Sequence, residues 1–354
     1  MYQWVKRIFS ASGPAPDAPG RTPGSQPAPA VAASAAPAGN AAQLSFEQRD
    51  GVNGSYFNWL FDNTDVTGLD TTPHENQVLD ALAAILASQQ SGAALVRRLP
   101  GLLPQLLQSL RSDNFSGAQL SRTISNDVVL VAAVIRMANT SFKGSGTTIT
   151  SVEHAVMLIG QEGLRHLITS VAFRPIIDLN SGQYTRLLAP RIWDQSERCA
   201  VANRMLAEDM GIDPFEAFLA GLVQNVGLIV TLRIMDQMSK SEKELGSEMF
   251  CARLVRDARI LTCSIGREWN FPESVVSAIG EQAGMRKGVP VSPLGRLLTQ
   301  SDYLSKVRIL VDNERLDKGD PVLFKGLSPR AMACYRELDA IDDDVAAAPA
   351  APAP

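Results

Sequence analysis

Histidine is the scarcest of the common metal-ligand residue types in this chain, with three among 354 residues: His74, His154 and His166. The four cysteines are Cys199, Cys251, Cys263 and Cys334, and no two of them form a Cys-x-x-Cys pair. Zinc sites and redox motifs depend on clusters of such residues. The sequence therefore predicts neither, and no cofactor is expected. We interpret the cysteines as small buried apolar residues in a reducing compartment.

Positive charge is not in excess either. Lysine and arginine number 33 against 37 acidic residues, which gives a formal net charge of -4. Proteins that bind phosphate backbones usually show a basic balance, so nucleic acid is not an expected partner. The apolar runs look shorter than the roughly 18 residues of a membrane-spanning helix, and the start, MYQWVKRIFS, is charged too early for a signal peptide. We expect a cytoplasmic protein without a transmembrane segment.

Familiar catalytic motifs are also missing. The chain has no Gly-x-Ser-x-Gly nucleophile elbow, no P-loop and no Rossmann glycine run. Its one glycine-rich segment, SFKGSGTTIT at residues 141–150, lies between helical patterns rather than between a strand and a helix. We interpret it as a loop and not as a phosphate cradle.

The chain is rich in Pro, Ala, Gly and Ser over residues 11 to about 42 and again at its C-terminal end. Such segments bury too little apolar surface to offset the entropy of ordering. We predict disorder over residues 1–43 and 341–354. The first ten residues place Trp4 and Ile8 on one helical face, which is typical either of a short docking peptide or of a frayed end.

Helix-start signals recur between residues 44 and 340. They are Asp213-Pro214 with Glu216, Ser292-Pro293, Ser328-Pro329, and a Thr150/Glu153 capping box. The stretches between them are amphipathic with helical spacing. The pattern predicts an all-α fold, with a main domain over residues 95–285 and helical extensions over residues 44–94 and 286–340. Each extension is expected either to pack on the domain or to form a dimer surface.

Five segments, in order, resemble the HDOD domain, a branch of the HD hydrolase superfamily. They are LVRRLPGLLPQLLQSL (95–110), ISNDVVLVAAVIRMANTSF (124–142), ITSVEHAVMLIGQEGLRHLI (149–168), FLAGLVQNVGLIV (218–230) and IGREWNFPESVVSAIGEQ (265–282). The resemblance implies an HD-like helical bundle.

Active HD enzymes hold a divalent metal with histidines and acids, and the resemblance shows where those ligands would lie. The first histidine position is Gln195, the His-Asp pair is Gln224 and Asn225, and the later His-His pair is Glu281 and Gln282. Among the acids, only Asp302 corresponds to a family ligand. Amides are poor ligands for transition metals, so the resemblance implies a fold without its metal.

We consider Gln195, Gln224, Asn225, Glu281 and Asp302 as the candidate site. Their amides could offer paired donors and acceptors to a small ligand or to a partner's side chain. Alternatively, they satisfy one another and are a relic of the metal site. The three histidines match none of the family's metal positions and are expected at the surface or in packing.

The leading functional hypothesis is a non-catalytic bacterial signal-transduction protein that acts through protein–protein interaction. The resemblance implies partners such as sensor kinases, receiver proteins or cyclic-dinucleotide enzymes, and a homo-oligomer is an open alternative. A second hypothesis is a metal-dependent nucleotide phosphohydrolase. A third is a sensor that binds a nucleotide or another small ligand without turnover.

Overall fold

The computed structural model describes residues 44–62, 69–88, 182–238, 245–285 and 289–338, with scattered positions between 131 and 173. The N-terminal peptide and linker, the C-terminal tail and the opening segment 95–110 lie outside these described residues. Within the described part every regular element is a helix and none is a strand. This confirms the predicted all-α class.

The described elements follow one another along the chain as two leading helices, a central group and two closing helices. They are α2 (Phe46–Leu60), α3 (Pro73–Ala87), α8 (Gln183–Ala207), η3 (Glu208–Met210), α9 (Pro214–Val223), α10 (Val226–Met238), α11 (Glu248–Glu268), α12 (Glu273–Ala283), α13 (Pro293–Asp312), η4 (Pro321–Phe324) and α14 (Pro329–Glu337).

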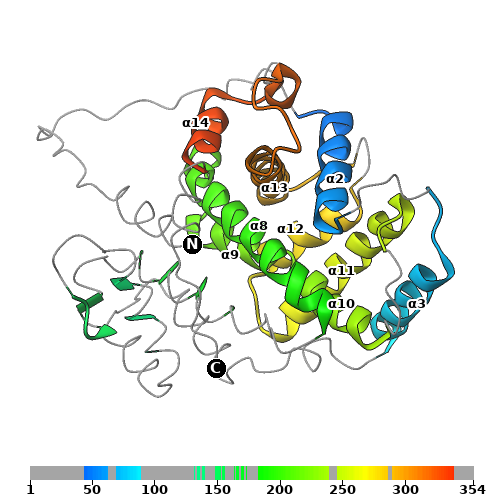
Figure 1. Cartoon of the computed structure of the whole chain (residues 1–354). Coiled ribbons are helices and arrows are strands. Elements are labelled where there is room, and N and C mark those ends of the chain that lie inside the picture. Colours follow the sequence, from blue (N-terminus) through cyan, green and yellow to red (C-terminus); the bar gives the residue numbers. More distant parts are fainter. Residues whose placement is uncertain are drawn as a thin grey trace, which may run out of the picture.

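The long helix α8 is the centre of this bundle (Figure 1). It packs against α9, α10 and α13, and most of its C-terminal half is buried. The approach of α9 is close because Gly221 faces the α8 backbone. A Cβ at this position would lie 2.6 Å from the Cα atom of Ala200, so the interface requires a residue without a side chain.

Three of the predicted helix starts are confirmed. The side chains of Asp213, Ser292 and Ser328 accept hydrogen bonds from backbone N–H groups three residues later. The predicted Thr150 cap is wrong, because Ser151 Oγ accepts the hydrogen bond from His154 N at 3.1 Å. His74 lies in the first turn of α3, where the side chain of Thr72 caps the helix and Pro73 is its first residue.

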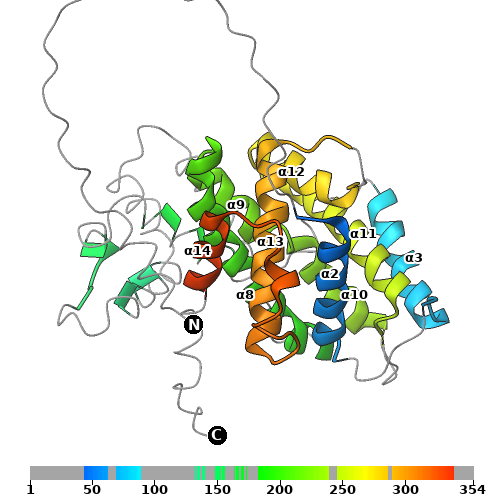
Figure 2. The same cartoon turned by 90° about the horizontal axis from the view of Figure 1, so that it is seen from above.

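Both extensions pack on the central helices (Figure 2). Helix α2 lies against α13, and α3 lies against α11 and α10. Helix α14 contacts α8 and α13. The chain on either side of the predicted domain therefore adds to one bundle, and α13 becomes buried along most of its length.

One stretch departs from the expectation that no apolar run is long enough to cross a membrane. Pro214–Met238, which spans α9 and α10, passes that test by length and composition, but 89% of its apolar window is buried inside the fold. Burial of this kind is typical of the core helices of a globular domain.

A buried carboxylate attaches α3 to the start of α11. Glu75 is 1% exposed. It accepts hydrogen bonds from the backbone N–H groups of Gly246 and Ser247, each at 2.8 Å, and from Thr72 N and Ser247 Oγ, each at 2.7 Å. Burial alone would raise the pKa of Glu75, but these donors outweigh it and the pKa is lowered from its ordinary value.

We predict that Glu75→Gln lowers the free energy of unfolding by about 2 kcal/mol at pH 7, because an amide nitrogen would face donors that now bind an ionised oxygen. A carboxylate with a lowered pKa stabilises the fold above its unfolded pKa and loses that effect as pH falls through the folded value. The difference in the free energy of unfolding between the wild-type protein and Glu75→Gln, measured with urea, should therefore become smaller below about pH 4. A loss that stays constant down to pH 3 would contradict this assignment.

Candidate functional site

The structure brings three of the five candidate residues into one polar network. Gln195 of α8 is fully buried. Its Nε2 donates to Asp302 Oδ1 at 3.0 Å and to Ser305 Oγ at 2.9 Å. Its Oε1 accepts from Asn225 Nδ2 at 2.6 Å, and the same Nδ2 lies 3.0 Å from Ser196 Oγ. The amides of Gln195 and Asn225 are thus bonded to each other, and Gln195 is also bonded to Asp302.

The charge of Asp302 is balanced by a lysine from the same helix. Lys306 lies one turn after Asp302 on α13, and its Nζ donates to Asp302 Oδ2 at 2.7 Å. A second donation goes to Asn53 Oδ1 of α2 at 2.8 Å. The ammonium also lies 5.3 Å and 5.6 Å from the ring centres of Tyr56 and Phe57, within the range of cation–π attraction.

This donor set does not fit a divalent metal. Both oxygens of Asp302 already accept hydrogen bonds, and Lys306 places a positive charge at the carboxylate that a metal would otherwise neutralise. Burial lowers the pKa of Lys306, while Asp302 opposes that effect and Arg259 adds to it. In the part of the chain that the structure describes, no group of three His, Cys, Asp or Glu residues could hold a metal ion.

The histidines lie elsewhere. His166 is buried and packs edge-on against Phe218, with ring centres 4.6 Å apart. This matches the expected packing role.

Gln224 lies apart from the network. It ends α9 and is 1% exposed, yet neither polar atom of its side chain has a hydrogen-bond partner among the residues that the structure describes. Cys199 is the neighbour it influences: burial raises the pKa of this thiol, and the Gln224 amide lowers it slightly. Gln224 is therefore buried near Cys199 of α8 and is not hydrogen-bonded to Gln195 or Asp302.

Glu281 also departs from the expected pocket. Its Oε2 accepts hydrogen bonds from Ser292 N at 3.1 Å and Ser292 Oγ at 2.9 Å. The carboxylate therefore supports the residue that caps α13. The side chain of the next residue, Gln282, is directed at α13, where it accepts a hydrogen bond from Thr299 and donates one to the carbonyl of Gly295.

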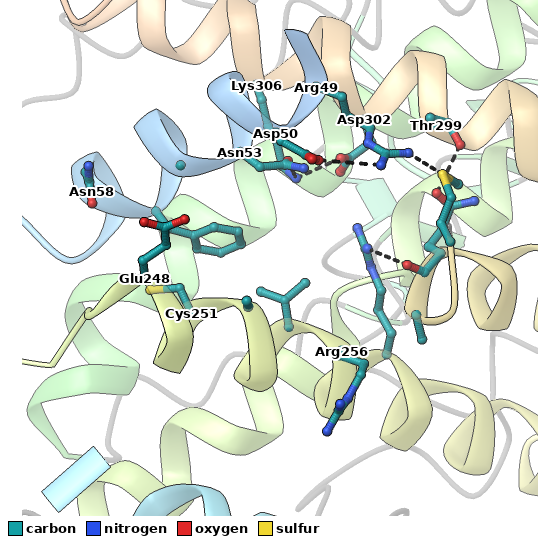
Figure 3. A pocket seen from close by; sticks show the side chains of 18 of the residues that line it. Arg49, Asp50, Asn53, Asn58, Glu248, Cys251, Arg256, Thr299, Asp302 and Lys306 are labelled. Atoms are coloured by element: carbon teal, nitrogen blue, oxygen red, sulfur yellow. Dashed lines mark hydrogen bonds and ion pairs between the residues drawn. The ribbon is translucent and has the colours of Figure 1, made fainter. Parts of the chain in front are cut away.

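A cavity of about 520 Å³ opens beside the network, between α2, α11 and α13 (Figure 3). Of the five candidate residues, only Asp302 reaches its wall. The polar side chains that line the cavity are Arg49, Asp50, Asn53, Asn58, Glu248, Arg256, Arg259, Gln282, Thr299, Asp302 and Lys306. The side chains of Gln195, Gln224 and Asn225 do not line it.

Sequence reasoning missed Lys306, Asn53, Arg49 and Arg259. Lys306 was detectable, since a cation four residues after an acid on a helix is placed to pair with it. Asn53 and Arg49 come from α2, about 250 residues away along the chain from Asp302. Only the folded arrangement brings them to the cavity.

Comparison with known proteins gives a consistent family. The sequence pattern of the HDOD domain matches residues 96–284, just over half of the chain. An uncharacterised protein of Treponema pallidum is 22% identical over 193 residues, which cover 52% of this chain and 37% of that relative. The chain therefore spans well under half the length of the curated relative that it matches.

Solved structures share the fold at low identity. An HDOD domain protein of unknown function from Geobacter sulfurreducens has a TM-score of 0.54 at 17% identity, over 75% of this chain and 94% of that one. A Marinobacter aquaeolei protein, provisionally named a signal transduction protein, has a TM-score of 0.53 at 18% identity, over 78% and 65%. A Shewanella amazonensis protein, provisionally named a phosphohydrolase, has a TM-score of 0.50 at 17% identity, over 75% and 93%.

We predict that Lys306→Met destabilises the protein by about 3–5 kcal/mol, because it leaves the Asp302 charge buried without its partner. The double variant Asp302→Asn/Lys306→Met should be more stable than Lys306→Met alone, since no uncompensated charge then remains. Urea unfolding of the two single variants and the double variant measures both effects.

The matched control is the exposed pair of Arg330 and Asp209, whose closest atoms are 3.4 Å apart. Arg330→Met should change stability by less than about 1 kcal/mol. If the double variant is less stable than either single variant, Lys306 does not compensate Asp302.

Proposed function

The chain belongs to the HDOD domain family, and from that premise we propose that it is a non-catalytic regulatory protein of bacterial signal transduction. In this proposal the protein acts by binding other proteins, and it is located in the cytoplasm. The observation that carries the proposal is the closed network around Asp302. Its hydrogen-bonding capacity is directed at Gln195 and Lys306, so the remaining acid of the HD site has a structural role.

Hydrolysis of a phosphate ester by an HD enzyme would need a metal to activate water at neutral pH. In this chain the ligand positions carry amides, and the amide of Gln195 bonds to Asn225 and Asp302. The provisional name of the Shewanella protein gives the phosphohydrolase alternative its support. The bonding of Asp302, Gln195 and Lys306 opposes that alternative.

A regulatory role agrees with the family and with the provisional name of the Marinobacter protein. The proposed partners are signalling proteins such as sensor kinases, receiver proteins or cyclic-dinucleotide enzymes. Such partners would dock on an exposed apolar surface surrounded by polar residues. Leu69 and Met249 offer one: they are 71% and 51% exposed, and the N–H of Met249 donates to the carbonyl of Leu69 at 3.2 Å.

We predict that Leu69→Asp/Met249→Asp abolishes partner capture without unfolding the protein. The measurement is a cross-linked affinity purification of the tagged full chain from its native host, with captured proteins identified by mass spectrometry. Two apolar anchors would be replaced by charges at the centre of the contact, where a loss of at least tenfold in affinity is expected.

Leu187→Asp is the matched control, because Leu187 is 52% exposed on α8. It should capture the same signalling protein as the wild-type chain. If no signalling protein is enriched by the wild-type chain, the adaptor proposal fails. If capture survives Leu69→Asp/Met249→Asp, the docking surface lies elsewhere on the molecule.

A further inference from the structure

The walls of the cavity beside Asp302 come from the N-terminal extension, from the matched HDOD region and from α13 of the C-terminal extension. Arg49, Asn53 and Phe57 come from α2, which precedes the matched HDOD region, whereas Arg259 comes from α11 within it. Its volume of about 520 Å³ lies in the range of small-molecule sites. Closure of this space therefore depends on the packing of the N-terminal extension on the family domain (Figure 3).

The deep charges of the cavity are predominantly positive. The Asp302 carboxylate is neutralised by Lys306. Asp50 and Glu248 stand at the exposed rim, where water screens them. Arg256 is also exposed and pairs with Asp257. The positive charges that remain inside belong to Arg49, whose side chain is 16% exposed, and Arg259, which is half-buried.

Both guanidinium groups have N–H donors that do not form short hydrogen bonds with a described carboxylate. Arg259 donates from Nη1 to the carbonyl of Gln282 at 3.1 Å, and within the described part of the chain its buried Nε has no hydrogen-bond partner. Arg49 contacts the sulfur of Met285 and lies 4.4 Å from the centre of the Phe46 ring, while its nearest carboxylate oxygen, on Asp50, is 3.5 Å away. Each arginine carries several N–H groups in a planar fork, so most remain free to bind a ligand.

The two arginines also oppose each other electrostatically. Burial lowers the pKa of Arg259, and the positive charge of Arg49 lowers it further, against the attraction of Asp302. An anion placed between two such cations reduces their mutual repulsion. It also accepts hydrogen bonds from buried N–H groups that otherwise lack an acceptor.

We propose that this cavity binds a small anion with two or more carboxylate or phosphate groups, held between Arg49 and Arg259. Guanidinium forks bind both kinds of group in bidentate fashion. The bound anion would bridge α2 and α11 and so fix the N-terminal extension on the family domain. This inference goes beyond the adaptor function and does not depend on it.

The test uses two probes, pyrophosphate and citrate, titrated into the full-length protein by isothermal calorimetry at fixed ionic strength. We expect saturable one-to-one binding of at least one probe. Binding of pyrophosphate alone assigns phosphate groups, and binding of citrate alone assigns carboxylates. Arg49→Gln and Arg259→Gln should each weaken binding at least tenfold. Arg267→Gln, an exposed arginine two turns further along α11, should bind as the wild-type chain does.

A second pair of variants leaves both arginines in place. Gly54 and Gly51 both lie on α2 with open space around a potential Cβ, but only Gly54 lines the cavity. Gly54→Leu should fill the space and abolish binding, whereas Gly51→Leu should leave binding unchanged. Both replace a glycine inside a helix, so neither is expected to unfold the protein.

The proposal is overturned if neither probe binds the wild-type protein, or if Arg267→Gln weakens binding as much as Arg49→Gln. It is also overturned if Gly54→Leu binds normally. None of these results would affect partner capture by the wild-type chain, so failure here and failure of the adaptor function remain distinguishable.

Discussion

A carboxylate at the centre of a helical bundle needs a counter-charge, and the pair formed by Asp302 and Lys306 meets that need within one helix. The ammonium is 2.7 Å from the carboxylate oxygen and 2.8 Å from Asn53 of α2. The opposite oxygen of Asp302 accepts from Gln195 of α8. Three helices therefore meet at one buried charge pair, and removing either member would leave a charge in a medium that solvates it poorly.

The amides at the positions that match HD metal ligands form hydrogen bonds compatible with this charge pair. The amide of Gln195 donates to Asp302 and accepts from Asn225 at the same time. A neutral imidazole has a single N–H group, so it could make both hydrogen bonds in only one of its two tautomers. Lys306 then supplies the positive charge. Gln195, Asp302 and Lys306 thus join α8 to α13, and of these three side chains Asp302 and Lys306 also line the cavity.

The position of α2 follows from the same joint. Asn53, Tyr56 and Phe57 surround the Lys306 ammonium, so the N-terminal extension is attached to α13 of the C-terminal extension, next to Asp302. The cavity adjoins this contact, since Asn53 and Lys306 line it together with Arg49 and Arg259. Ligand binding in the cavity and the packing of α2 are thus linked through neighbouring turns of one helix.

The fold class and the starts of α9, α13 and α14 could be read from the sequence, because caps such as Asp213 and Ser292 act through residues three positions away. The network of Gln195, Asn225 and Asp302 depended on the family resemblance. The places of Gln224 and Glu281 outside this network could not be predicted, because a resemblance gives the position of a residue but not the direction of its side chain. Arg49 and Asn53 could not be predicted, since their partners are distant in the sequence.

The most direct test of the account is the metal content of the full-length protein after incubation with Mn²⁺ and desalting. We predict much less than one ion per chain, and no cleavage of nucleotide phosphate esters. The control is a variant that restores the ligands, Gln195→His/Gln224→His/Asn225→Asp/Lys306→Ala, which should gain Mn²⁺ if these positions alone exclude it. One tightly held ion per wild-type chain, together with cleavage that Asp302→Ala abolishes, would contradict the account.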